Sequence, residues 1–116
     1  MSTADIDDID DIPTVPYFLI LLQPGPNRAA EPEHRAAHIA FIETMEAANV
    51  VLLGGEFDSL LDGAQAAYLL RASSRSEAEE WAARDPLIVE KVFQARAVTW
   101  HLVGIAATAI DPTFSA

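Results

Sequence analysis

The sequence predicts an α+β fold of the ferredoxin-like type, a four-stranded antiparallel sheet with two main helices in the order βαββαβ. Two observations support this prediction: short apolar segments bounded by glycine or proline, and longer segments with apolar residues at helical spacing. Two helices can cover only one face of such a sheet. Because the predicted strands are apolar on both faces, we expect a second copy of the chain to cover the other face, forming a homodimer.

The expected elements are strands at residues 17–23, 50–53, 65–72 and 95–103, helices at 31–49 and 74–85, a helical turn within 87–93, and a loop at 56–63. The first strand is a continuous apolar run that stops at Pro24, which is typical of a strand covered on both faces. The first helix has Pro32 in its first turn and Asn49 as its C-cap. Gly54 and Gly55 are expected to end the second strand and to allow another group to approach closely.

The second half of the chain predicts two strands on either side of a capped helix. Residues 65–72 alternate between two faces, as a strand does. Ser74 followed by Glu77 is a capping box, which marks the start of a helix. Since Pro86 disfavours helical geometry in the residue before it, this helix is expected to end at Asp85. The last strand is again apolar on both faces.

Composition narrows the class of protein. The 116 residues predict one folded domain at 16–104, between an acidic disordered tail at 1–15 and a C-terminal tail at 105–116. The net charge of −11 argues against nucleic acid or an anionic membrane as a partner. The chain has no cysteine, no basic signal-peptide start and no apolar run long enough to span a membrane, so we expect a cytoplasmic protein without disulfides.

One ionisable residue in each predicted helix occupies a core-facing position. Phe41, Ile42 and Met45 fall within about 60° of His38 on a helical wheel, so the imidazole should face the core. Asp85 takes the next position on the apolar stripe of the second helix, at the end where the helix dipole is negative and burial adds a desolvation cost. We therefore expect Asp85 to be solvated or paired with a cation, and His38 is a candidate partner.

A buried aspartate beside His38 would fix the imidazole tautomer and leave the second ring nitrogen free to move protons. This is general acid–base chemistry, which needs no metal, nucleophile or cofactor. The residues alone also allow His38 to be a core histidine bonded to a backbone carbonyl, and Asp85 to be a local cap before proline. His34 and His38 could share a metal, but a third ligand is lacking, so we expect no metal and no cofactor.

Two further residues are assigned to substrate binding. Arg35 lies almost one turn before His38 and could hold an anionic substrate group, or could simply face solvent. Gly55 follows the second strand, where a glycine permits close approach. Nucleotide-binding and serine-hydrolase motifs are absent from the sequence.

These residues resemble the YCII-related (YciI-like) family over roughly residues 17–103. The resemblance rests on Arg-Ala-Ala-His-Ile at 35–39, Leu-Gly-Gly at 53–55, Trp-Ala-Ala-Arg-Asp-Pro-Leu at 81–87 and Val-Phe at 92–93. It implies a dimeric α+β barrel, in which the sheet of a ferredoxin-like protomer packs on its twin. It also implies a His–Asp pair in a pocket, here His38 and Asp85, proposed as catalytic. One relative eliminates HCl from a chlorinated hydroxyhydroquinone, and muconolactone isomerases share the wider superfamily.

We therefore predict a small cofactor-independent enzyme, of lyase or isomerase type, acting on a small cyclic or aromatic substrate. His38 would be the acid or base, and Asp85 would orient it. The alternative is a non-catalytic dimer that binds a small ligand or stabilises a partner protein, in which the pair is structural. A third possibility is a cofactor-free oxygenase on the same barrel.

Overall fold

The computed structural model describes residues 14–103 of the chain. Its elements are β1 (Thr14–Pro24), the 3-10 turn η1 (Arg28–Ala30), α2 (Glu31–Ala47), β2 (Val51–Leu61), β3 (Ala64–Arg71), α3 (Arg75–Ala83), α4 (Pro86–Val89) and β4 (Phe93–Val103). The predicted C-terminal tail lies outside the described residues. The predicted N-terminal tail also lies outside them, except that Thr14 and Val15 belong to β1, which begins earlier than expected.

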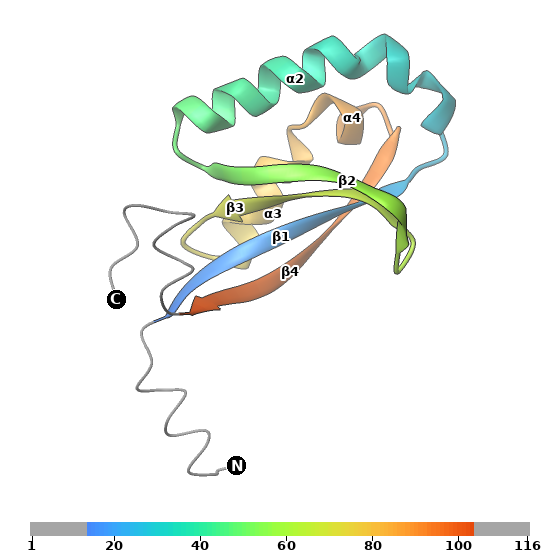
Figure 1. Ribbon diagram of the computed structural model, residues 1–116. Helices are drawn as coiled ribbons and strands as arrows, with labels where there is room; N and C mark the ends of the chain where they lie inside the picture. Colours follow the sequence, from blue (N-terminus) through green and yellow to red (C-terminus); the bar gives the residue numbers. More distant parts are fainter. Residues whose placement is uncertain (1–13, 104–116) are drawn as a thin grey trace.

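The four strands form one antiparallel sheet in the order β2-β3-β1-β4. This order, with α2 joining β1 to β2 and α3 with α4 joining β3 to β4, is the split βαβ arrangement of a ferredoxin-like fold. Figure 1 shows the twisted sheet with α2 running across it on the β2 side. The α+β prediction is confirmed.

The main core lies between the helices and one face of the sheet. It contains the apolar residues that alternate to that face of β1, β3 and β4, together with one stripe from each helix (Phe18, Ile20, Leu22, Met45, Leu70, Ala78, Ala82, Leu87, Val92 and Ala97 among them). A second, smaller cluster forms around Tyr17 and Leu69 on the opposite face. Trp100, which pairs with Tyr17, is 49% exposed there. The sheet is thus apolar on both faces, as expected, and the homodimer through the second face stays a prediction.

β2 is longer than predicted, because the strand does not end at Gly54 and Gly55 but runs to Leu61. The expected loop at 56–63 is therefore wrong. Only Asp62 and Gly63 form the turn, and both have positive φ, which matches the Asp-Gly pair favoured in a two-residue type I′ hairpin. Such a tight turn pairs the residues on its two sides directly, so the strand extends to it. β2 accommodates the extra residues through shifts of register.

The ends of the helices follow local sequence signals. Asn49 adopts a left-handed conformation with φ of 62°, and the N–H of Val50 donates to the carbonyl of Met45 at 2.8 Å. This is a Schellman motif, in which Ala48 is the C-cap and Asn49 is the left-handed residue after it, so the predicted C-cap is one residue too late. At the start of α3 the Ser74 side chain accepts a hydrogen bond from the Glu77 N–H at 3.1 Å, which confirms the predicted cap.

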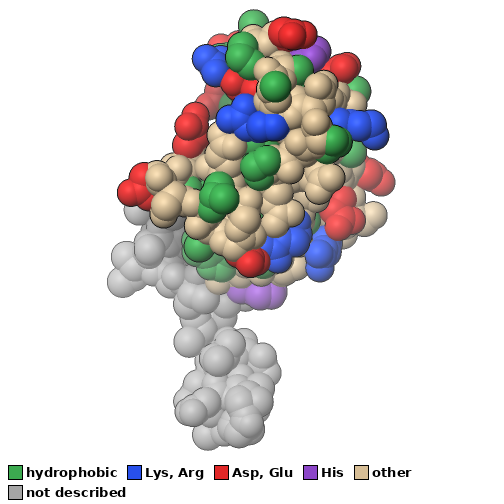
Figure 2. Space-filling view, turned by 90° about the vertical axis from the view of Figure 1, so that its right-hand side faces the viewer, with side chains coloured by type: hydrophobic (Ala, Val, Ile, Leu, Met, Phe, Trp, Pro, Cys, Tyr) green, Lys and Arg blue, Asp and Glu red, His purple; other side chains and the backbone are tan. Residues whose placement is uncertain are grey.

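Among residues 14–103, no helix is long and apolar enough to cross a lipid bilayer. Figure 2 shows one face of the molecule, where acidic and basic side chains alternate with small hydrophobic patches. On this face the acidic excess of the chain does not gather in a single patch.

Candidate active site

His38 and Asp85 come from different helical segments and meet. Helix α2 directs the His38 side chain toward the sheet, where it is 20% exposed. Its Nδ1 lies 2.9 Å from both carboxylate oxygens of Asp85, whose side chain is completely buried. Asp85 is therefore paired with His38, the partner that the sequence suggested for it.

The helix position expected for Asp85 is wrong. Helix α3 ends at Ala83, and Asp85 is the N-cap of the separate helix α4, with an extended backbone at φ −62° and ψ 126°. The reason is Pro86, which excludes the helical conformation from the residue before it and starts the next helix itself. The carboxylate therefore lies at a helix end where the dipole favours negative charge, and the N–H of Leu87 donates to its Oδ1 at 2.9 Å.

Tyr68 is a third member of this cluster that the sequence analysis did not assign to the site. Its buried hydroxyl donates to Asp85 Oδ2 at 3.2 Å. Burial, the negative charge of Asp85 and this hydrogen bond together raise the pKa of Tyr68, so the hydroxyl stays protonated and acts as a donor. A signal was available, because strand alternation directs Tyr68 to the helix side and a buried tyrosine hydroxyl needs a partner.

The hydrogen bonds determine which nitrogen of His38 is free. An ionised carboxylate only accepts hydrogen bonds, so Nδ1 of His38 carries a hydrogen, and in the neutral ring Nε2 carries the lone pair. No residue among those described at 14–103 hydrogen-bonds to Nε2. Two further donors, the Tyr68 hydroxyl and the Leu87 N–H, hold the carboxylate in place. Asp85 thus orients the imidazole, and Nε2 is available to a ligand.

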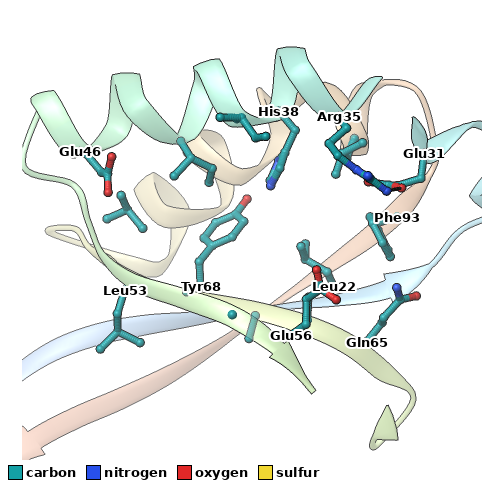
Figure 3. A pocket seen from close by; sticks show the side chains of 18 of the residues that line it. Leu22, Glu31, Arg35, His38, Glu46, Leu53, Glu56, Gln65, Tyr68 and Phe93 are labelled. Carbon is teal, nitrogen blue, oxygen red and sulfur yellow. Dashed lines mark hydrogen bonds and ion pairs between the residues drawn. The ribbon is translucent and has the colours of Figure 1, made fainter. Parts of the chain in front are cut away.

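His38 and Tyr68 lie midway along a pocket of about 500 Å³ between α2, β2 and β3. Figure 3 shows His38 pointing from α2 toward the sheet and Tyr68 rising from β3 to meet it. Glu46 and Leu53 mark one end of the pocket in this view; Glu31, Gln65 and Phe93 mark the other. A pocket of this size can hold a small organic molecule.

Arg35 and Gly55 both line this pocket. Arg35 is 61% exposed at its rim and donates through Nε and Nη2 to Glu31, with a distance of 2.8 Å from Nε to Oε2. This hydrogen bond and the charge of Arg35 lower the pKa of Glu31. At Gly55 an added Cβ would meet no atom within 4 Å, whereas at Gly54 it would lie 3.0 Å from the Cβ of Tyr68. The close approach expected at the glycine pair therefore occurs at Gly54, and Gly55 borders open space.

Within the part of the chain that the structure describes, no group of three or more histidine, cysteine, aspartate or glutamate side chains is arranged to hold a metal ion. His34 precedes His38 by one turn of α2, and the third ligand that a shared metal site would need is not found in that part of the chain.

Comparisons with known proteins agree with this architecture. The family model for the YCII-related domain matches residues 17–101. A search of curated proteins found no match. A similar solved structure is the 5-chloro-2-hydroxyhydroquinone dehydrochlorinase TftG from Burkholderia phenoliruptrix AC1100, in complex with 2,5-dihydroxybenzoquinone. It is 22% identical, with a TM-score of 0.58 over 72% of this chain and 92% of that one, a likeness that shows the shared fold. Since the family model covers most of the sequence, the chain belongs to the family of YCII-related domains.

Proposed function

We propose that this protein is a cofactor-independent enzyme that moves a proton on a small cyclic or aromatic substrate, as a lyase or an isomerase. His38 is the acid–base residue, and Asp85 positions it. The observation that supports this role is the asymmetry of the imidazole: Nδ1 is held by a buried carboxylate, while Nε2 has no partner among the described residues and His38 lines a pocket of about 500 Å³.

In an elimination, Nε2 of His38 takes a proton from the carbon next to the one that bears the leaving group. The electrons of the broken C–H bond form the new double bond, and the leaving group departs with its bonding pair. The resulting imidazolium is stabilised by the negative charge of Asp85, 2.9 Å from Nδ1. In an isomerisation, the same nitrogen returns the proton to a different carbon.

The similar structure supports the choice of reaction class. TftG is by name a dehydrochlorinase, and its structure holds a dihydroxybenzoquinone, a flat ring of the size that this pocket accommodates. In this proposal Arg35 and Gly55 border the bound substrate, and the open space beside Gly55 admits part of the ring. The homodimer through the second sheet face is part of the proposal, supported by the exposed apolar side chains of Val98 and Trp100 on β4.

The test is a turnover screen of the full chain with chlorinated hydroquinones and with cyclic keto acids, followed by His38→Ala on any substrate found. We expect kcat to fall by about 10²- to 10⁴-fold, the usual contribution of a positioned acid or base. His101→Ala, at an exposed position of β4, is the matched control and should retain the wild-type rate. Circular dichroism checks that both variants are folded. Equal turnover in His38→Ala and wild type would contradict the proposal.

One observation favours the non-catalytic alternative, a module that binds a small ligand or stabilises a partner protein. Asp85 caps α4 and accepts from Tyr68, so the cluster has a structural role that does not depend on chemistry. In that case His38→Ala would lower the melting temperature without changing any turnover. The same variant therefore separates the two functions.

A further inference from the structure

Arg28 lies in the lining of the pocket and was not singled out from the sequence. Its Nε donates to Oε1 of Gln65 at 3.0 Å, and its guanidinium carbon lies 5.2 Å from the centre of the Phe93 ring. Figure 3 labels Gln65 and Phe93 at the end of the pocket away from Glu46, so these two contacts place Arg28 at that end. The side chain is partly buried.

These two contacts fix the plane of the Arg28 guanidinium and leave its outer edge unused. Only Nε makes a hydrogen bond to a described residue; the Nη1 and Nη2 groups make none within residues 14–103. A guanidinium held in this way presents two parallel N–H donors, the geometry that matches a carboxylate. The contact with the Phe93 ring also reduces the rotamer freedom that Arg28 would lose on binding.

Arg35 differs from Arg28 in both respects. It is 61% exposed, and it already makes two hydrogen bonds to Glu31. Together Arg35 and Glu31 form a pair with no net charge. Among the described residues that line the pocket, Arg28 is therefore the cation that forms no ion pair with a described carboxylate.

Leu53 and Glu46 mark the opposite end of the pocket (Figure 3). The apolar side chains of Ile42, Val51 and Leu52, which neighbour these two residues in the sequence, also line the pocket. His38 and Tyr68 stand between the two ends (Figure 3). From Glu31 to His38 the helix α2 rises about 10 Å, which sets the scale of the separation between the Arg28 end of the pocket and the imidazole. The chain carries a net charge of −11, which repels small anions. A small anion therefore binds favourably only beside a cationic side chain that it can reach.

We propose that Arg28 binds the carboxylate of a small aromatic or cyclic carboxylic acid, whose hydrocarbon ring extends along the pocket toward His38. This inference rests on the proposed function and names its substrate class. Arg28 is the group that binds the anion, Gln65 and Phe93 position it, and the Arg35–Glu31 pair borders the entrance.

The test measures binding, not turnover. Isotope-labelled full-length protein is titrated with benzoate and with the neutral analogue benzyl alcohol, and dissociation constants are obtained from NMR chemical shifts. We expect benzoate to bind more tightly than benzyl alcohol. Arg28→Gln should raise the dissociation constant of benzoate by about tenfold or more, the range for a hydrogen bond to a charged group, with little change for benzyl alcohol. Arg28→Lys should restore part of the affinity, because it keeps the charge and loses the paired donors.

Two controls accompany this series. Arg75→Gln makes the same change in net charge at an exposed position on α3 and should leave the affinity for benzoate unchanged. The double variant Glu31→Gln, Arg35→Gln removes the neighbouring pair without changing net charge and should reduce the affinity less than Arg28→Gln does. A larger loss in the double variant would assign the anion to Arg35 and overturn the proposal.

Two other results would also overturn it: equal affinity of the wild type for benzoate and benzyl alcohol, or an equal loss of both ligands in Arg28→Gln, which would show that Arg28 only supports the structure. The outcomes separate this inference from the proposed function. If the protein shows a carboxylate preference that depends on Arg28 but no turnover, the result supports this inference and contradicts the proposed enzymatic function. Turnover that depends on His38 without a carboxylate preference contradicts the inference alone.

Discussion

Helix α2 contributes to two charge pairs, His38–Asp85 and Arg35–Glu31, and both lie within hydrogen-bond distance. The shortest contacts that define them are 2.9 Å between Nδ1 of His38 and Asp85, and 2.5 Å between Nη2 of Arg35 and Glu31. They differ in burial: Asp85 is completely buried, whereas Arg35 is 61% exposed. Hydrogen-bond distance alone therefore does not tell which pair the fold depends on.

Burial matters because a carboxylate without water must obtain its hydrogen bonds from the protein. Asp85 obtains them from His38, Tyr68 and the Leu87 N–H, and it cannot be removed without leaving these donors without an acceptor. Water can replace either member of an exposed pair, and dissolved salt screens the charges. We therefore expect the buried cluster to determine stability and chemistry, and the exposed pair to have small effects on both.

The largest effect is expected from Asp85→Ala. It leaves three donors without an acceptor, two of them buried, and removes the cap of α4, so the free energy of unfolding should fall by about 3–5 kcal/mol, the cost of breaking a buried pair. Urea denaturation measures this change. Asp85→Asn is the matched variant: it keeps one oxygen for the Leu87 N–H and should lose less. If Asp85→Ala unfolded at the same urea concentration as the wild type, the contrast with the exposed pair would disappear.

Tyr68→Phe removes one donor from the carboxylate and should lower the free energy of unfolding by about 2 kcal/mol, as for a hydrogen bond to a charged group. It should also change the response to alkaline pH. Because burial and Asp85 raise the pKa of Tyr68 in the folded state, unfolded tyrosine ionises first, above its ordinary pKa of about 10. Stability contributed by Tyr68 is complete below that pH and is lost as the pH rises.

The response to alkaline pH is tested by denaturation curves between about pH 8 and pH 11, the range in which a free tyrosine titrates. The wild type should lose stability above about pH 10 more steeply than Tyr68→Phe does. Parallel curves for the two proteins would show that Tyr68 is not held in its protonated form by the cluster.

A smaller effect should come from crowding the cluster through the backbone beside it. In Gly54→Ala the new Cβ would lie 3.0 Å from the Cβ of Tyr68, so we expect a loss of about 1 kcal/mol as the strands shift apart. Gly55→Ala is the neighbouring control, since its Cβ meets no atom within 4 Å. Thermal melts of both variants measure the difference. Equal melting temperatures would mean that β2 accommodates the added Cβ at Gly54 without loss of stability.

The smallest effect is expected from Glu31→Gln in the exposed pair. Its hydrogen bond to Arg35 lowers the pKa of Glu31 below the usual 4.5, so the pair contributes above that pH and is lost as the pH falls through the lowered pKa. A double-mutant cycle with Arg35→Gln should give a small coupling at pH 7 that vanishes in acid and in 1 M salt. A coupling that persists in high salt would contradict the description of this pair as solvated.

Much of the fold could be predicted from the sequence, because periodicity and caps are local. The alternation of residues 65–72, the cap at Ser74 and the helix end at Asn49 all follow from neighbouring residues. The length of β2 could not be predicted, because its second half shows no apolar alternation. Its pairing with β3 depends on the hairpin turn and on shifts of register. Pro86 indicated that a helix ends before it. The sequence analysis did not infer that Pro86 also begins a new helix, with Asp85 as its N-cap.

The site was predicted in part for the same reason. His38 and Asp85 stand out because each is an ionisable residue on an apolar stripe, and they are hydrogen-bonded in the structure. Arg28 carries no such signal, because its position depends on Gln65 and Phe93, which are 37 and 65 residues away in the sequence (65 − 28 and 93 − 28). For Tyr68, strand alternation indicates that its hydroxyl needs a partner but does not identify Asp85 as that partner. The roles assigned to Arg35 and Gly55 stay predictions.

In the proposed function, Asp85 holds the hydrogen of His38 on Nδ1 and leaves Nε2 as the proton acceptor. Long-range ¹H–¹⁵N NMR correlations of the histidine side chains, recorded where the ring is neutral, measure which nitrogen carries the hydrogen. We expect the Nδ1–H form for His38 in the wild type and loss of this preference in a folded Asp85→Ala variant. An Nε2–H form for His38 in the wild type would contradict this role of Asp85.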